Sequence, residues 1–230
     1  MSTPAAPFNF RRVPLSGALL RTRIIAVLRA QDSSRMNAAA DILVANGIRC
    51  LEVATTTKGA LDAVERLAGR LPAGVDVGLG TVMTPGEALR AADAGARFIV
   101  APHTATDVIH AARNLGLASH PGALTPSEIQ LAWRAGASAV TLFPAGPLGT
   151  AYLAAVLAPL PHIDVIPAGS LSLAETAGWL AAGATAVGLG GSLLGDALSP
   201  GGDLDALAER TRRVCAAAES VPRRDASAEQ

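Results

Sequence analysis

A short pattern occurs four times in this sequence: the end of a predicted helix, then a glycine, then an apolar strand. The copies span residues 46–53, 94–100, 135–140 and 182–187, with Gly47, Gly95, Gly136 and Gly183 after the helical part. Glycine suits the end of a helix because it adopts a positive φ without a steric penalty. Recurrence at roughly 40 to 50 residues indicates repeated strand and helix units.

A second pattern marks helix starts between these copies. Thr84-Pro85-Gly86-Glu87, Thr125-Pro126-Ser127-Glu128 and Ser172-Leu173-Ala174-Glu175 have the spacing of a capping box. Together the patterns predict strands near residues 23–29, 49–54, 75–80, 97–101, 117–121, 138–143, 163–167 and 185–189, each followed by a helix. This alternation favours a single (β/α)8 TIM barrel over a doubly wound open sheet, the alternative.

We expect one domain over residues 21–220, because barrels of this length commonly fold as one unit. Residues 1–20 are interpreted as an N-terminal arm or capping helix, and residues 221–230 as a disordered polar tail. Cys50 and Cys215 have no zinc-type spacing, so both are expected to be reduced core residues.

The charge of the chain argues against large anionic partners. The formal net charge is +0, and 17% of the residues are charged, so no basic surface for nucleic acid or an anionic membrane is expected. No secretory leader and no membrane-length apolar run is evident in the sequence. These features predict a cytoplasmic protein whose partner is a small neutral or anionic molecule.

Sites in this fold lie at the carboxyl ends of the strands, and Glu52 is the one carboxylate at such an end. It stands between Leu51 and Val53, and an apolar setting raises a carboxyl pKa toward the range of a general acid and base. A structural pair with Arg29 is the alternative interpretation. Arg29, Thr56 and His103, which also follow strands, are further candidates for substrate binding.

Two glycine and serine segments follow the last two predicted strands: Gly169-Ser170 and Gly190-Gly191-Ser192. Backbone amides and hydroxyls at these two strand ends are typical of a phosphate or carboxylate site. His103 and His120 could form a metal site with Glu52, but ordinary hydrogen-bonding histidines are favoured, and no metal or cofactor is expected.

The strand-end motifs, in this order, resemble the 2-keto-3-deoxy-6-phosphogluconate (KDPG) and 4-hydroxy-2-oxoglutarate (KHG) aldolase family over roughly residues 20 to 215. The motifs are Ile24-Ile-Ala-Val-Leu-Arg29, Leu51-Glu-Val53, Gly78-Leu-Gly-Thr-Val82, Ala101-Pro102, Pro121-Gly122, Leu142-Phe-Pro-Ala145, Pro167-Ala-Gly-Ser170 and Gly188-Leu-Gly-Gly-Ser192.

The resemblance implies a homotrimeric barrel that cleaves a 2-keto-4-hydroxy acid to pyruvate and an aldehyde through a lysine imine. It implies that Glu52 is the acid and base and that Thr81, Pro102 and Phe143 line the pyruvate end. Gly169, Ser170, Gly190, Gly191 and Ser192 would then hold the distal phosphate or its replacement.

Two positions depart from the family pattern. The imine lysine falls on Thr141, and the arginine that binds the substrate carboxylate falls on Thr56. Lys58 is the one lysine of the sequence, so it is the candidate for a relocated amine. Three hypotheses follow: a lyase with reduced or altered activity, an enolate enzyme such as an epimerase or isomerase that uses metal or hydrogen bonds, and a non-catalytic binding protein.

Overall fold

The computed structural model describes residues 12–223 and has an α/β fold. Its strands are β1 (Ile24–Leu28), β2 (Cys50–Ala54), β3 (Asp76–Gly80), β4 (Phe98–Val100), β5 (Ala118–His120), β6 (Gly122–Ala123), β7 (Val140–Leu142), β8 (Val165–Pro167) and β9 (Val187–Leu189). Every predicted strand region contains one of them. All the strand pairs are parallel, as expected where helices connect successive strands.

The strands form two hydrogen-bonded sheets rather than the single eight-stranded sheet that we predicted. One curled sheet has six strands in the order β5-β4-β3-β2-β1-β9, and the other has three in the order β6-β7-β8. The predicted fifth strand, 117–121, contains β5, and after Pro121, which has no backbone N–H to donate, the chain continues as β6 in the other sheet. The prediction of a full barrel is therefore met only in part.

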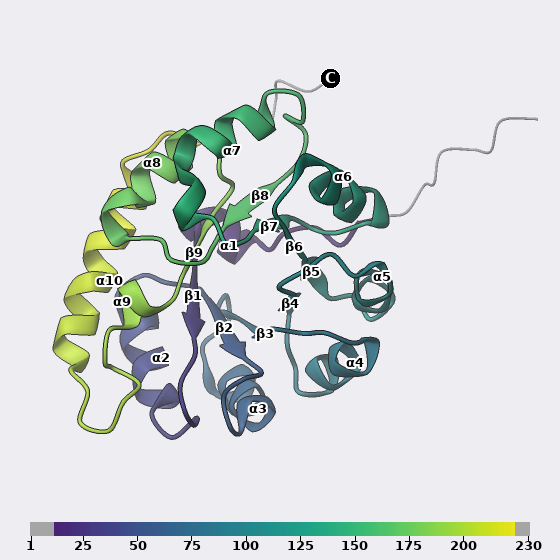
Figure 1. Cartoon of the computed structure of the whole chain (residues 1–230). Coiled ribbons are helices and arrows are strands. Elements are labelled where there is room, and N and C mark those ends of the chain that lie inside the picture. The colour runs from purple at the N-terminus through teal and green to yellow at the C-terminus, as the bar shows by residue number, and fades with distance from the viewer. Residues whose placement is uncertain (1–11, 224–230) are drawn as a thin grey trace, which may run out of the picture.

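The helices surround the strands, except α1, which lies across one end of them (Figure 1). They are α1 (Gly17–Thr22), α2 (Met36–Ala45), α3 (Ala60–Arg70), α4 (Pro85–Asp93), α5 (Thr106–Asn114), α6 (Pro126–Ala135), α7 (Gly149–Leu157), α8 (Thr176–Ala181), α9 (Gly191–Leu194) and α10 (Leu204–Glu219), with 3-10 turns η1 (Gly146–Leu148) and η2 (Leu173–Glu175). The three predicted capping boxes are confirmed, and Thr84, Thr125 and Ser172 are their N-cap residues. The four repeat glycines all have positive φ.

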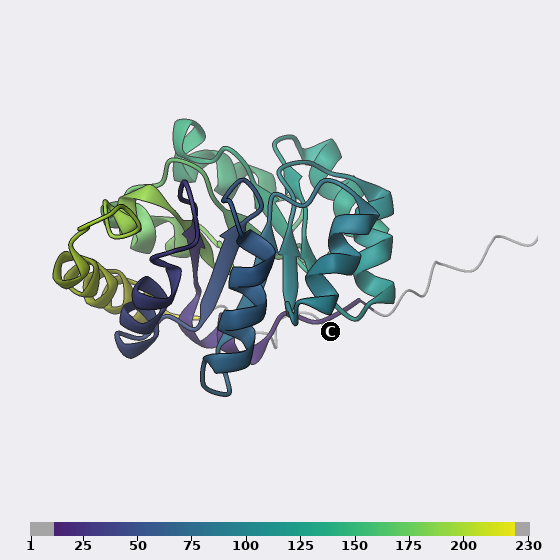
Figure 2. The same ribbon diagram turned by 90° about the horizontal axis from the view of Figure 1, so that it is seen from below.

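The N-terminal part of the described chain packs against one end of the strands. Ser16 caps α1 by accepting a hydrogen bond from the Leu19 amide at 3.1 Å. The helix ends at residue 22, so it crosses the expected boundary at residue 20. Figure 2 shows this purple segment running across one end of the strands. Residues 1–11 of the expected arm and 224–230 of the expected tail lie outside the described residues.

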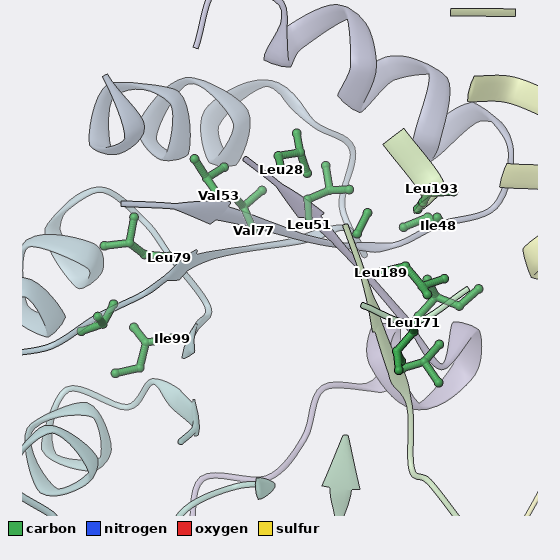
Figure 3. Packing of buried hydrophobic residues seen from close by; sticks show 14 of the residues in the cluster. Leu28, Ile48, Leu51, Val53, Val77, Leu79, Ile99, Leu171, Leu189 and Leu193 are labelled. Carbon is green, nitrogen blue, oxygen red and sulfur yellow. The ribbon is translucent and has the colours of Figure 1, made fainter. Parts of the chain in front are cut away.

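The strands bury both faces, and their residues alternate between two apolar clusters. Leu28, Leu51, Val53 and Leu79 point toward the surrounding helices (Figure 3). The inner cluster contains residues of the opposite strand face together with Ala18 and Leu19 of α1: Ile25, Cys50, Phe98, Ala118, Ala139, Ile166 and Ala186. Because Leu51 and Val53 face outward, the alternation of a strand turns Glu52 inward.

No helix in the described range is long and apolar enough to cross a membrane. Cys50 is buried in β2 and Cys215 is partly buried in α10, and neither is in a disulfide.

Candidate active site

A cavity of about 810 Å³ opens where the strands end, within the size range of small-molecule sites. Eleven of the predicted site residues line it: Arg29, Glu52, Thr81, Pro102, Thr141, Phe143, Gly169, Ser170, Gly190, Gly191 and Ser192. They come from the ends of seven strands of both sheets and the loops that follow. These strand ends therefore surround one cavity.

Glu52 projects into this cavity from β2 and is only 7% exposed. Burial raises its pKa from 4.5 to about 7, because desolvation penalises the charged carboxylate, and nearby Arg29 opposes this rise. A group that titrates near neutral pH can both accept and donate a proton under physiological conditions. The alternative of a structural ion pair is not supported, since the ion pair found among residues 12–223 joins Arg70 and Asp41.

Gly80 provides the space that the Glu52 side chain occupies. A Cβ atom at Gly80 would lie 2.0 Å from Glu52 Oε1. Sequence reasoning missed this role, although the alternation of Gly78 and Gly80 along β3 is a signal that two inward positions carry no side chain.

Thr141 lies in β7 and is 4% exposed, with its hydroxyl donating to the backbone carbonyl of His120 at 3.2 Å. It occupies the strand position where the family resemblance expects the imine lysine. A threonine hydroxyl has no nitrogen to condense with a ketone, so this position offers only a hydrogen bond.

Thr81 follows β3 in a left-handed conformation, with φ of 60°. This conformation is uncommon for a β-branched residue and stores strain, which is often found at functional sites. The Thr55 hydroxyl donates to the Thr81 carbonyl at 3.0 Å, and the Thr55 amide donates to Gly80 at 2.9 Å. The loop after β2 thus holds the loop after β3 in place.

The Gly169-Ser170 and Gly190-Gly191-Ser192 segments meet at the β8 and β9 side of the cavity. Gly169 has φ of 88°, and a Cβ atom there would lie 2.8 Å from the Phe143 ring. Ser170 also has a positive φ, of 59°, a backbone shape that glycine adopts at lower cost. Arg29 is the one cationic side chain among the described residues that line the cavity.

The segment that runs from the end of α9 onward, which we call the rim (residues 193–202), forms a further wall that sequence reasoning did not identify. Leu194, Leu198 and Ser199 are among its lining residues. Arg210 of α10 donates to the carbonyls of residues 193 and 194 at 2.6 and 2.9 Å. Arg35 donates to those of residues 197 and 202 at 3.0 and 2.8 Å. The Pro200-Gly201-Gly202 sequence signals a turn, but not which residues hold it.

Three predicted site residues lie outside the cavity lining. Thr56, Lys58 and His103 are exposed and do not line it. The Lys58 backbone pairs instead with Asp32, through the Ser33 amide at 3.1 Å and the Gln31 carbonyl at 3.3 Å. Lys58 lies just before α3, whose N-cap residue is Gly59.

The proposed metal ligands are not brought together. Among residues 12–223, no three His, Cys, Asp or Glu side chains are grouped so that they could hold a metal ion. His103 is exposed, whereas His120 is 2% exposed and stacks on Phe98 with ring centroids 5.2 Å apart.

Comparisons with known proteins agree with this geometry. A family model described as "Aldolase: KDPG and KHG aldolase" matches residues 16–209. The chain is 32% identical over 191 residues to a probable 2-dehydro-3-deoxy-6-phosphogalactonate aldolase of Rhizobium meliloti, covering 83% of this chain and 89% of the relative. It is 33% identical over 178 residues to the KHG/KDPG aldolase of Escherichia coli K12, covering 76% and 82%.

A solved 2-keto-3-deoxy-6-phospho-gluconate aldolase structure from Zymomonas mobilis superposes with a TM-score of 0.77 at 26% identity. The match covers 90% of this chain and 97% of that one. The likeness therefore extends over nearly the whole fold.

Proposed function

Because the chain belongs to the KDPG and KHG aldolase family, we propose that it is a lyase that cleaves a 2-keto-4-hydroxy sugar acid to pyruvate and an aldehyde. The observation that carries the proposal is Glu52, a buried carboxyl with a pKa near 7 in the strand-end cavity. It accepts the proton of the 4-hydroxyl as the C3–C4 bond breaks, and later returns a proton to C3.

The rest of the cavity divides between the two ends of such a substrate. Thr81, Pro102 and Phe143 line the pyruvate end, and Gly169, Ser170, Gly190, Gly191 and Ser192 line the distal end. The Gly191 and Ser192 amides are the first of α9 and have no acceptor within that helix, so they suit an anionic group or hydroxyls. Arg29 supplies the positive charge for a carboxylate.

Without a lysine at residue 141, the enzyme does not use the imine route of its relatives, and its activity on KDPG and KHG is reduced. Lys58 does not replace the missing amine, because it is exposed outside the cavity lining. The ketone must instead be activated by hydrogen bonds, as in other enzymes that stabilise an enolate.

Substrate cleavage and borohydride trapping test this function. Pyruvate release from KDPG and KHG is measured beside an imine-forming aldolase, and we expect slow release that Glu52→Gln abolishes. After borohydride reduction with pyruvate, mass spectrometry should find the wild-type Lys58 peptide unmodified and a reduced pyruvate adduct on residue 141 of Thr141→Lys.

Turnover as fast as that of the imine-forming enzyme would refute the reduced-activity proposal, and an adduct on Lys58 would restore the relocated amine. Ligand stabilisation without any turnover would favour a binding protein instead.

The same proposal includes a closed eight-stranded barrel over residues 21–220. Supporting contacts join the two sheets: the Thr185 amide donates to Val165 at 2.9 Å, Ala168 pairs with Gly188, and the Ser138 amide donates to Ser119 at 2.9 Å.

We further propose a cytoplasmic homotrimer. As the contact we propose an apolar patch made of five exposed side chains on or beside the neighbouring helices α4, α5 and α6: Met83, Leu89, Leu115, Leu124 and Leu131. Exposed apolar side chains on neighbouring helices favour a contact between subunits.

A further inference from the structure

His120 lies inside the ring of strands and is 2% exposed, and it is not among the residues that line the cavity. In β5 it pairs in register with Val100, and parallel partners point to the same face of a sheet. Val100 lines the cavity, so His120 also points inward. Its ring stacks on Phe98, which lies two residues before Val100 on β4 and faces inward as well. The imidazole is therefore buried among inward-facing side chains, and its strand partner Val100 lines the cavity.

Thr141 is the neighbour of His120 on the other side. Gly122, the next inward position after His120, pairs in register with Thr141. The Thr141 hydroxyl also donates to the His120 carbonyl at 3.2 Å. His120 thus lies between the strand of Val100 and the strand of Thr141, and its backbone contacts the residue where the family lysine is expected.

Both ring nitrogens of His120 are buried and have no hydrogen-bond partner among residues 12–223. Unsatisfied buried polar groups are rare, because each costs free energy of desolvation. The His120 ring therefore has two nitrogens that could form hydrogen bonds. We infer that their partner is a bound ligand. Burial also lowers the pKa of His120 from 6.5 to about 4, so the imidazole is neutral at physiological pH.

We propose that His120 is the catalytic group that replaces the missing amine, donating a ring N–H hydrogen bond to the C2 carbonyl oxygen of the bound keto acid. The inference rests on the proposed function. It requires the ring to turn about its Cα–Cβ bond from Phe98 toward Thr141. A neutral imidazole is suited to this task, and neutral histidine paired with a glutamate base is known to polarise a ketone during enolisation.

The bonds balance without a cofactor. Glu52 takes the proton from the 4-hydroxyl, the C3–C4 bond breaks, and the aldehyde C4=O forms. The bonding pair enters C2–C3 and leaves charge on the C2 oxygen, where the His120 N–H stabilises it. Protonated Glu52 then gives its proton to C3, which yields pyruvate.

Exchange of the pyruvate methyl protons with D2O tests the inference, because it needs only the enolisation step. The rate is followed by proton NMR for the wild type, Glu52→Gln, His120→Leu and His120→Gln. We expect exchange in the wild type, none in Glu52→Gln, and a loss of roughly 100- to 1,000-fold in His120→Leu, as for removal of an oxyanion donor. His120→Gln keeps an N–H donor and should recover part of the rate.

His103→Gln is the matched control, since His103 is exposed and does not line the cavity, and it should exchange at the wild-type rate. The infrared stretch of [2-13C]pyruvate provides a second measurement: binding to the wild type should lower the carbonyl frequency, and His120→Leu should remove that shift.

The possible failures are distinguishable. Wild-type exchange or an unchanged carbonyl shift in folded His120→Leu overturns the role of His120, and the proposed function survives if Glu52→Gln is still inactive. A wild type that binds pyruvate without a carbonyl shift also overturns it. A wild type that neither exchanges nor binds pyruvate overturns both.

Discussion

At the scale of single residues, the site contains ionisable side chains that are buried, so their charged forms lose the stabilisation that water would give them. Glu52 and His120 are each nearly inaccessible, and burial keeps both neutral over a wide pH range. Each group therefore lowers the stability of the fold under some conditions. The loss can be measured as a change in the free energy of unfolding when the residue is replaced. A residue kept for packing alone should not show such a loss.

Replacing His120 with leucine should stabilise the protein. Leucine has a similar volume and no ring nitrogens, so the substitution removes two unsatisfied polar atoms and should raise the free energy of unfolding by about 1 to 2 kcal/mol at pH 7. The advantage should grow as pH falls from 6.5 toward 4, because the unfolded chain protonates His120 before the native state does. Urea unfolding at pH 7 and pH 5 measures it, and a loss of stability at pH 7 would contradict the expectation.

Glu52→Gln should change stability with the opposite pH dependence. The native pKa is raised from 4.5 to about 7, so the native state binds the proton more tightly than the unfolded chain does. Ionisation of Glu52 therefore destabilises the wild type progressively as pH rises from 4.5 through 7, by at most about 3 kcal/mol. Urea unfolding should find the variant relatively more stable at pH 8 than at pH 5. A pH-independent difference between the two proteins would contradict the burial argument.

At the scale of elements, the strand ends position the site, and glycine at position 80 leaves the space that the neighbouring Glu52 side chain occupies. Gly80→Ala adds a Cβ atom that would lie 2.0 Å from Glu52 Oε1, so the carboxyl must move. We expect pyruvate exchange to fall about 100-fold, because a displacement of roughly 1 Å has that effect on a catalytic group.

Gly69→Ala in α3 is the matched control for Gly80→Ala. Its added Cβ meets nothing within 4 Å, so it should leave exchange unchanged and stabilise the helix by about 1 kcal/mol. Equal rates for Gly80→Ala and the wild type would mean that Glu52 does not depend on this space.

The sequence predicted elements better than it predicted contacts between them. Strand positions and capping boxes follow from local pattern, so they could be read directly. The change from one sheet to the other at Pro121 was not predicted. It depends on a single missing backbone N–H, which the apolar pattern of the strand does not show. The rim was not predictable, because Arg35 reaches it from a distant part of the chain and no local pattern shows that Arg210 of α10 turns back to it. The partnerless state of His120 likewise depends on its neighbours in three dimensions.

At the scale of the whole molecule, the apolar patch over α4, α5 and α6 predicts how subunits assemble. Leu131 is 52% exposed in α6, so Leu131→Glu should cost the subunit little but place a charge in the proposed trimer contact. Light scattering after gel filtration should give a trimer for the wild type and a smaller species for the variant.

Leu20→Glu is the control for the trimer contact, since Leu20 is 45% exposed in α1, outside the patch. It should remain trimeric. A trimeric Leu131→Glu, or a monomeric wild type, would contradict the proposed contact.

The exposure of Lys58 also makes the protein convenient to label. It is the one lysine in the sequence, and it lies outside the cavity on a loop whose backbone pairs with Asp32. Among side chains, an amine-reactive fluorophore has this single target, without mutagenesis and without blocking the ligand. A fluorophore on Lys58 would therefore lie next to the segment that includes Asp32 and Ser34, two residues that line the cavity.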